Sequence, residues 1–396
     1  MSDTVESLTD LLERAGSKRF LQVPGIVDLG LADPVNFPFL ALVGQREMKL
    51  ALLLSLINPN IGGVLLLGPR GTGKTTAVRS LVDLMPEVPR SKCHYGCMPE
   101  DIERGGIDAI CPNCAKKYGE GESLTVTDHV QLVELPLNAR LEDVVGGLDQ
   151  RAAVHNRVRI KKGLLARADR HLLYVDEVNL LADDIVDAIL DAAAQGTYTV
   201  HRGPLSATYK SRFVLIGSMN PEEGQLRPQI LDRFGLRVIV RGLDQREERL
   251  EAYRRSVEFL NNPHKLVSAF SDSTANARDE LAEARRALQA VGLSESAIEV
   301  GSNLIEEMGI ESLRAEITLF EAARAHAIAD GREEADVEDI HVTAKMALRL
   351  RRSDFIRDYL ASQSQEDKDL SQIMSELPTK ESKPKSKKTS QKKSQK

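Results

Sequence analysis

The chain has 396 residues, 42% of them hydrophobic and 28% charged, which is typical of a globular protein with two or three domains. No apolar run approaches the roughly 18 residues of a membrane-spanning helix, and the acidic N-terminus lacks a signal-peptide pattern, so we expect a cytoplasmic protein without membrane insertion. The net charge is −6, although residues 380–396 carry +7. The absence of Trp and the 4% aromatic content argue against a nucleic-acid surface built on base stacking.

The first residues predict an extension ahead of the first domain. We expect this extension to span residues 1–33, with an amphipathic helix within residues 1–20. A helix from Glu47 to Leu56 follows, and it should end at Asn58-Pro59-Asn60, because Asn and Pro favour turns.

The apolar run Val64 to Leu67 is followed by a segment that fits G-x-x-x-x-G-K-[ST] at every fixed position. In such a loop, glycines let backbone N–H groups converge on phosphates, and the helix that follows adds its positive end. Lys74 would reach the β- and γ-phosphates of a nucleoside triphosphate, and the Thr75 hydroxyl would ligate Mg²⁺. The strand–loop–helix context disfavours a chance glycine-rich turn. The predicted binding loop comprises Gly68, Pro69, Arg70, Gly71, Thr72, Gly73, Lys74, Thr75 and Thr76.

Residues 86–125 interrupt the pattern and contain all four cysteines, Cys93, Cys97, Cys111 and Cys114. Paired thiolates at short spacing are typical of a tetrahedral Zn²⁺ site, with His94 as a possible substitute ligand. The surrounding sequence indicates turns with little core. A structural zinc site is therefore favoured over unpaired thiols and over a redox Cys-x-x-Cys.

Alternating strands and helices continue to residue 243 and predict a parallel α/β sheet. The expected strands include one from Leu172 to Val175 and another from Arg212 to Gly217, with a helix from Asp183 to Gln195 and a hairpin from Thr197 to Ser206.

Two carboxylates follow the Leu172 to Val175 strand. We expect this strand to lie beside the P-loop strand, so that Asp176 points at Mg²⁺ and Glu177 acts as general base toward the attacking water. The weaker alternative is a helix-capping Asp with a surface Glu.

Three further polar residues are candidates for the same site. Asn220 follows a predicted strand and could orient the attacking water, although Asn-Pro also starts turns. Arg233, on a short predicted helix, could reach the γ-phosphate held by a neighbouring copy of the chain, with Asp232 orienting it; an ordinary surface pair is the alternative. Arg314 opens a later helix, and spacing alone favours a surface arginine, although a lid that folds over the nucleotide would bring it to the phosphates.

After residue 243 the apolar spacing becomes helical and strand signals end, which predicts a separate all-α domain over residues 244–360. The Lys-rich residues 361–396 predict a disordered tail, which is more simply a solubilising extension than an electrostatic tether.

Together, the P-loop, Val175 to Glu177, Gly217 to Gly224, Leu226 to Leu236 and Ser312 to Ala323 resemble the ATPase subunit I of magnesium chelatase, an AAA+ family of chlorophyll and bacteriochlorophyll biosynthesis. The resemblance covers roughly residues 34–352. It implies an AAA+ α/β ATPase domain over residues 34–243 and a helical lid over residues 244–360.

The resemblance also implies roles for individual residues. Lys74 and Thr75 would belong to Walker A, and Asp176 and Glu177 to Walker B. Asn220 would be sensor 1, Arg233 the arginine finger and Arg314 sensor 2. Ala139 to Gly163 would be the helix insert, and the Thr197 to Ser206 hairpin would precede sensor 1.

As partners and cofactors, the resemblance implies ATP, Mg²⁺, a hexameric homo-oligomer and the two other components of the chelatase, known as its D and H proteins. The H protein, rather than this chain, would bind protoporphyrin IX. The cysteine insert and the lysine tail are not general marks of the family. A MoxR-type remodelling ATPase and a cobalt-chelatase motor therefore stay open as alternatives.

Overall fold

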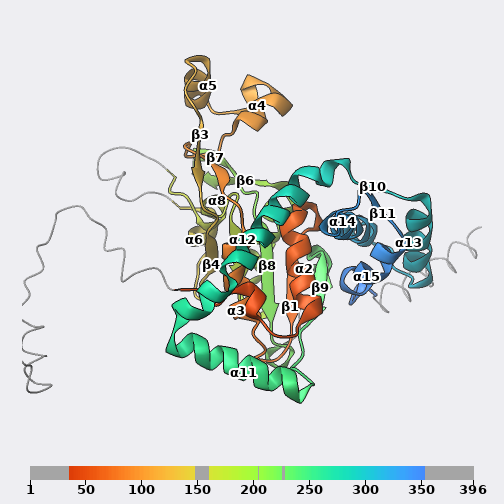
Figure 1. Ribbon diagram of the computed structural model, residues 1–396. Coiled ribbons are helices and arrows are strands. Elements are labelled where there is room, and N and C mark those ends of the chain that lie inside the picture. Colours follow the sequence, from red (N-terminus) through yellow and green to blue (C-terminus); the bar gives the residue numbers. More distant parts are fainter. Residues whose placement is uncertain (1–34, 148–159, 204, 225–227, 353–396) are drawn as a thin grey trace, which may run out of the picture. The chain divides into compact units, whose positions relative to one another are not determined.

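A five-stranded parallel sheet organises the computed structural model, which describes residues 35–147, 160–203, 205–224 and 228–352 (Figure 1). The predicted parallel α/β sheet is confirmed. Because the strands are parallel, the segments that follow them meet at one edge of the sheet. Across the sheet the order is β4-β5-β8-β1-β9, with bounds β1 (Val64–Leu67), β4 (Leu132–Leu135), β5 (Leu172–Val175), β8 (Val214–Met219) and β9 (Leu236–Ile239).

The predicted pairing of the P-loop strand with the strand that leads to Asp176 is wrong. The strand that leads to Asp176, β5, does not lie beside the P-loop strand β1, because β8 pairs with both and separates them. All residues of β1, β5 and β8 are buried, so their hydrophobicity could not indicate the order in which these three strands lie across the sheet. The acidic strand therefore acts across one intervening strand.

Helices cover both faces of the sheet. Val64 and Leu66 of β1 pack in a core with α2 (Arg46–Ile57) and α3 (Lys74–Ser80). Leu65 and Leu67 point the other way, into a core with α9 (Asp183–Gln195). This alternation follows from the two-residue period of a strand.

Shorter elements surround the sheet edges. The predicted hairpin is confirmed, but it extends to Lys210 instead of ending at Ser206, with Thr197 paired to Lys210 and Arg202 to Leu205. The predicted helix insert, Ala139 to Gly163, lies within the described residues only up to 147 and from 160. The elements are α6 (Leu141–Val145), α8 (Leu164–Arg167), β6 (Thr197–Arg202), β7 (Leu205–Lys210) and α10 (Pro228–Arg233).

The cysteine-containing segment has more regular structure than the turns we expected. An antiparallel ribbon of β2 (Val88–Ser91) and β3 (Thr125–Asp128) leads to α4 (Pro99–Gly105) and α5 (Pro112–Gly119). Pro99 and Pro112 occupy the first helical positions, where proline is tolerated, so these prolines begin helices instead of marking turns.

The C-terminal region is helical, as predicted. Its last two helices share the first core with the sheet. The expectation that strands end at residue 243 is wrong in one place, because β10 (Gly292–Leu293) pairs with β11 (Glu334–Ala335); two-residue strands carry no periodic signal. The helices are α11 (Arg246–Asn261), α12 (Pro263–Ala287), α13 (Glu295–Glu307), α14 (Leu313–Ala329) and α15 (Val337–Leu348).

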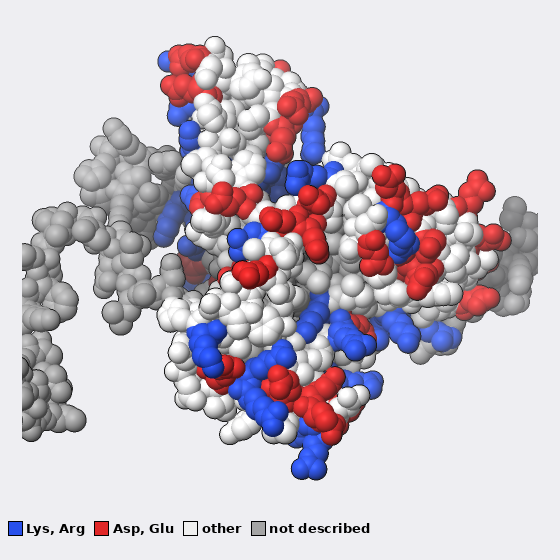
Figure 2. All heavy atoms as spheres, viewed as in Figure 1, with Lys and Arg blue, Asp and Glu red and all other residues white. Residues whose placement is uncertain are grey.

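Charged side chains are unevenly distributed over the surface of the described residues. Figure 2 shows acidic side chains gathered over the region of α13, a helix with four Glu and no Lys or Arg. None of the helices in the described part of the chain is long and apolar enough to cross a membrane. The expected N-terminal helix and lysine-rich tail lie outside the described residues.

Candidate active site

The P-loop turns sharply between β1 and α3. Gly71 and Gly73 have φ of 78° and 85°, values that L side chains rarely adopt. A Cβ at Gly68 would lie 2.1 Å from the carbonyl oxygen of Val240, so this position has no room for a side chain. The pattern predicted from sequence therefore forms a turn that only glycine permits.

Lys74 lies within this turn. Its Nζ donates hydrogen bonds to the carbonyl oxygens of Gly68 at 2.6 Å and Pro69 at 2.8 Å. Burial lowers the pKa of Lys74, and the nearby Asp176 carboxylate offsets part of this effect. The ammonium group is thus held at the mouth of the loop by carbonyls that a phosphate could replace.

A hydroxyl network links the P-loop to the acidic strand across β8. The Tyr174 hydroxyl lies 3.2 Å from Thr75 Oγ1 and donates to Asp176 Oδ1 at 2.9 Å. Ser218 Oγ, from the intervening strand, also donates to Asp176. Burial raises the pKa of Tyr174 to about 12, so its hydroxyl stays a donor. Thr75 and Asp176 are therefore brought together, with oxygen ligands that suit Mg²⁺.

Glu177 lies next to Asp176 in a left-handed conformation, with φ of 49°. Such a conformation costs a non-glycine residue about 1 kcal/mol and often occurs at functional positions. Its carboxylate pairs with Arg70 Nη2 at 3.1 Å, and Arg70 Nε pairs with Glu223 at 2.7 Å. A P-loop side chain therefore holds the candidate general base.

Asn220 follows β8 and is buried at the same edge. Its Oδ1 accepts from the backbone N–H of Glu222, which is the turn role weighed from sequence. Its Nδ2 donates to Glu223 at 2.9 Å, and this hydrogen bond is the main reason why the pKa of Glu223 is lowered. The side chain thus sits at the edge of the site and is already engaged.

The P-loop, the two carboxylates Asp176 and Glu177, and the end of β8 line a cavity of about 260 Å³. A second cavity of about 580 Å³ lies on the other side of Gly71 to Gly73, between the start of α2 and α11. The first has the donors for phosphates, and the second is large enough for a base and sugar. Lining residues of the first cavity include Lys74, Thr75, Asp176, Glu177, Ser218 and Asn220.

Arg233 and Arg314 lie elsewhere. Both line a separate cavity of about 170 Å³ with α9 and α14, and neither is among the described residues around the P-loop cavity. Arg233 pairs with Asp191, and Arg314 lies 3.9 Å from Asp232. The structure therefore does not support the expectation that Arg314 reaches phosphates held by its own chain.

The Asp232 carboxylate has a stronger partner that sequence analysis missed. Arg351 donates to Asp232 Oδ1 at 2.9 Å and to the carbonyl of Gly235 at 3.1 Å, and its side chain is fully buried. It also donates to the Thr318 hydroxyl of α14. This arginine clamps α10 to the C-terminal helices.

The four cysteines also come together, with all Sγ atoms within 4.8 Å of one another. His94, the alternative ligand, instead places Nε2 3.3 Å from the Tyr209 hydroxyl, so the structure does not support it as a substitute ligand.

Comparisons with known proteins give consistent matches. A family model described as magnesium chelatase, subunit ChlI, matches residues 147–230, and one described as an AAA lid domain matches residues 301–374. The magnesium-chelatase subunit ChlI homolog of Methanocaldococcus jannaschii is 42% identical over 323 residues, covering 81% of this chain and 87% of that protein. The magnesium-chelatase 38 kDa subunit of Acidiphilium rubrum is 41% identical over 317 residues, covering 80% and 90%. A crystal structure of a candidate ATPase from Cytophaga hutchinsonii has a TM-score of 0.52 at 21% identity, over 79% and 84% of the two chains, which shows a shared fold.

Proposed function

The chain belongs to the family of magnesium-chelatase subunit I ATPases, and on that basis we propose that it hydrolyses ATP as the motor of a magnesium chelatase. The observation that carries the proposal is the convergence of Lys74, Thr75, Asp176 and Glu177 at one sheet edge, in a chain that matches the family over four-fifths of its length.

One chain supplies the first part of the ATPase site. The P-loop N–H groups and Lys74 would hold the phosphates, and Thr75 and Asp176 would hold the Mg²⁺ that accompanies ATP. When bound, Mg²⁺ would neutralise phosphate charge during bond breaking. The Glu177 carboxylate, which pairs with Arg70 in this structure, would leave that ion pair to bind the attacking water. It would then act as general base and take a proton from the water.

A neighbouring copy of the chain supplies the remaining part of the ATPase site. Arg233 and Arg314 share a cavity apart from the P-loop, so an assembled ring would present both to the nucleotide of the next copy. An arginine offered in this way contributes about 10³–10⁵ in rate. The ring is a hexamer, and the D protein of the chelatase forms its partner ring.

The porphyrin stays on the H protein of the chelatase, which performs the insertion of Mg²⁺ into protoporphyrin IX. Mg²⁺ gives up its bound waters reluctantly, so its insertion into the porphyrin requires free energy, which ATP turnover would supply. This chain supplies that work and does not contact the porphyrin.

Reconstitution tests the proposal. The chain is mixed with the D and H proteins, ATP, Mg²⁺ and protoporphyrin IX, and Mg-porphyrin absorbance is followed. Product should form, and the Glu177→Gln variant should bind ATP without supporting it. Absence of product, with the D and H proteins shown to be active alongside another ATPase of this family, would contradict the proposal.

A further inference from the structure

We propose that Cys93, Cys97, Cys111 and Cys114 bind one structural Zn²⁺ ion, and that this ion braces the β6–β7 hairpin against the ATPase domain. The site lies in the segment between β2 and β3, outside the ATPase site described above.

The sulfur geometry fits a tetrahedral ion. Zn–S bonds of about 2.3 Å place the four sulfurs about 3.8 Å apart. Cys93 Sγ lies 3.6 Å from both Cys97 Sγ and Cys111 Sγ, and all four sulfurs lie within 4.8 Å of one another. A disulfide needs about 2.0 Å, and all four thiols are free. Four thiolates fill a tetrahedral shell, so the site is structural rather than catalytic.

Hydrogen bonds and charges around the sulfurs favour thiolates. The backbone N–H of Tyr95 donates to Cys93 Sγ, and that of Cys111 donates to Cys97 Sγ, each at 3.3 Å. Lys92 and Lys117 line the same cavity as three of the cysteines, so positive charge is close to a centre that would carry −2.

The segment lacks a core that could fold it without metal. Its buried cluster consists of Cys97, Ile110, Cys114 and Leu124, with Cys93, Ile102, Cys111 and Ala115 at its margin. Half of these residues are cysteines. Segments of about 40 residues usually need a metal, a disulfide or a partner to stay folded.

The turn between the first two ligands docks on the end of the hairpin. Two of its residues contact the hairpin: His94 Nε2 lies 3.3 Å from the Tyr209 hydroxyl, and the Tyr95 carbonyl accepts from Lys210 N–H at 3.2 Å. The third, Gly96, accepts through its carbonyl from Nη2 of Arg212, which follows the hairpin, at 3.2 Å. A metal that fixes Cys93 and Cys97 therefore fixes the shape of the docking turn.

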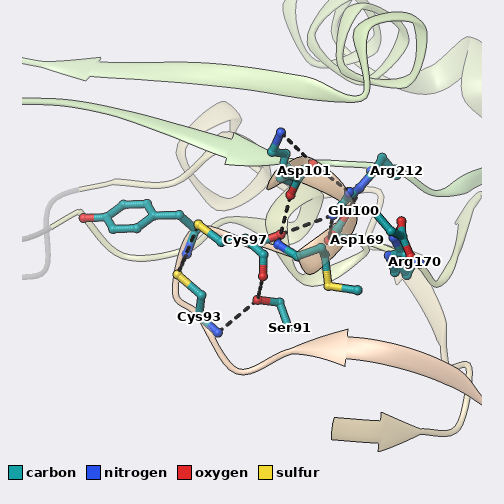
Figure 3. Close-up of polar contacts among 12 residues, drawn as sticks. Ser91, Cys93, Cys97, Glu100, Asp101, Asp169, Arg170 and Arg212 are labelled. Atoms are coloured by element: carbon teal, nitrogen blue, oxygen red, sulfur yellow. Dashed lines mark hydrogen bonds and ion pairs between the residues drawn. The ribbon is translucent and has the colours of Figure 1, made fainter. Parts of the chain in front are cut away.

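A charge cluster secures the same junction (Figure 3). Asp101, in the first turn of α4, pairs with Lys210 at 3.2 Å and Arg212 at 3.4 Å, and Arg212 also pairs with Asp169 at 3.1 Å. Arg212 lies two residues before β8, the strand that carries Ser218 and leads to Asn220. The metal-bound turn is thus connected to the hairpin and to the strand at the centre of the ATPase site.

The first test measures metal in the full chain, purified without a metal-affinity step or added metal. Elemental analysis should find about one zinc per chain, and an organomercurial should release it as four thiols react. A metal-free protein with four reactive thiols would overturn the proposal, as would iron with visible thiolate-to-iron absorbance.

The second test separates binding from bracing by hydrogen exchange in residues 197–210. Cys111→Ser should lose the zinc and speed exchange in the hairpin at least tenfold. His94→Ala and Asp101→Asn are matched controls that should keep one zinc per chain while loosening the hairpin. If Cys111→Ser fails to fold, zinc release from the wild-type chain by the organomercurial serves the same comparison. Unchanged hairpin exchange in zinc-free protein would overturn the brace.

Discussion

The Asp232 carboxylate has one buried arginine partner, Arg351, and one exposed partner, Arg314. Comparing the two tests how the C-terminal helices are attached to the ATPase domain. Arg351 lies 2.9 Å from Asp232 with a fully buried side chain, whereas Arg314 lies 3.9 Å away with half of its side chain exposed. We predict that Arg351→Met destabilises the protein and that Arg314→Met does not.

The expected size follows from the contacts that each arginine makes. Arg351 donates to Asp232, to the carbonyls of Phe234, Gly235 and Ala347, and to the Thr318 hydroxyl. Removing one partner of a buried ion pair costs about 3–5 kcal/mol. Asp232 is partly exposed and can regain water, so we take about 3 kcal/mol, the lower end of that range. For Arg314, an exposed pair is worth about 0–1 kcal/mol.

Thermal unfolding followed by circular dichroism at pH 7 measures the difference. Arg351→Met should lower Tm by roughly 5–10 °C, and Arg314→Met should change it by less than about 2 °C. Equal shifts for both variants, or none for Arg351→Met, would refute the clamp.

Three further predictions concern single groups. Tyr174→Phe keeps the ring but removes the hydroxyl between Thr75 and Asp176, so the Mg²⁺ concentration for half-maximal ATPase should rise about tenfold while metal-free ATP binding stays unchanged; an unaltered Mg²⁺ dependence would count against the network. Gly235→Ala should cost about 3 kcal/mol in urea unfolding, because its Cβ would lie 1.8 Å from the Ile61 carbonyl oxygen, whereas Gly242→Ala, in open space, should be neutral. Burial alone would raise the pKa of Asp339, but hydrogen bonds from Arg332 and His326 hold it below its usual value, so the stability it contributes is present above about pH 4 and lost as the pH falls below that. Asp339→Asn should flatten this acid limb of the unfolding curve, and an unchanged limb would exclude the residue as its source.

Local patterns predicted most of the sheet and the nucleotide loop. Strand β1 and helix α9 have the expected bounds, because a short apolar run before a glycine-rich loop and an amphipathic helical period are both local signals. Lys74, Thr75 and Asp176 come together for the same reason, since each immediately follows a recognisable strand or loop.

The failures concern partners that are distant in sequence. Ser218 follows the strand predicted over Arg212 to Gly217, and nothing local indicates that its hydroxyl donates to Asp176, 42 residues earlier in the chain. Arg237 lies in a strand and is fully buried, with its guanidinium bonded to the Arg349 carbonyl at 2.7 Å. Burial, with the nearby Arg351 charge, lowers the pKa of Arg237 to about 9. Such contacts depend on the assembled tertiary structure.

The central claim is that one chain holds the nucleotide and its neighbour completes the site, and mixing two inactive variants tests it most directly. Lys74→Ala lacks the phosphate ligand and Arg233→Ala lacks the donated arginine, so each alone should be almost inactive. In a one-to-one mixture that assembles at random into closed rings, about a quarter of the interfaces join an intact Lys74 to an intact Arg233, and ATPase activity should return in that proportion. A mixture as inactive as its two components would show that both residues must act within the same chain.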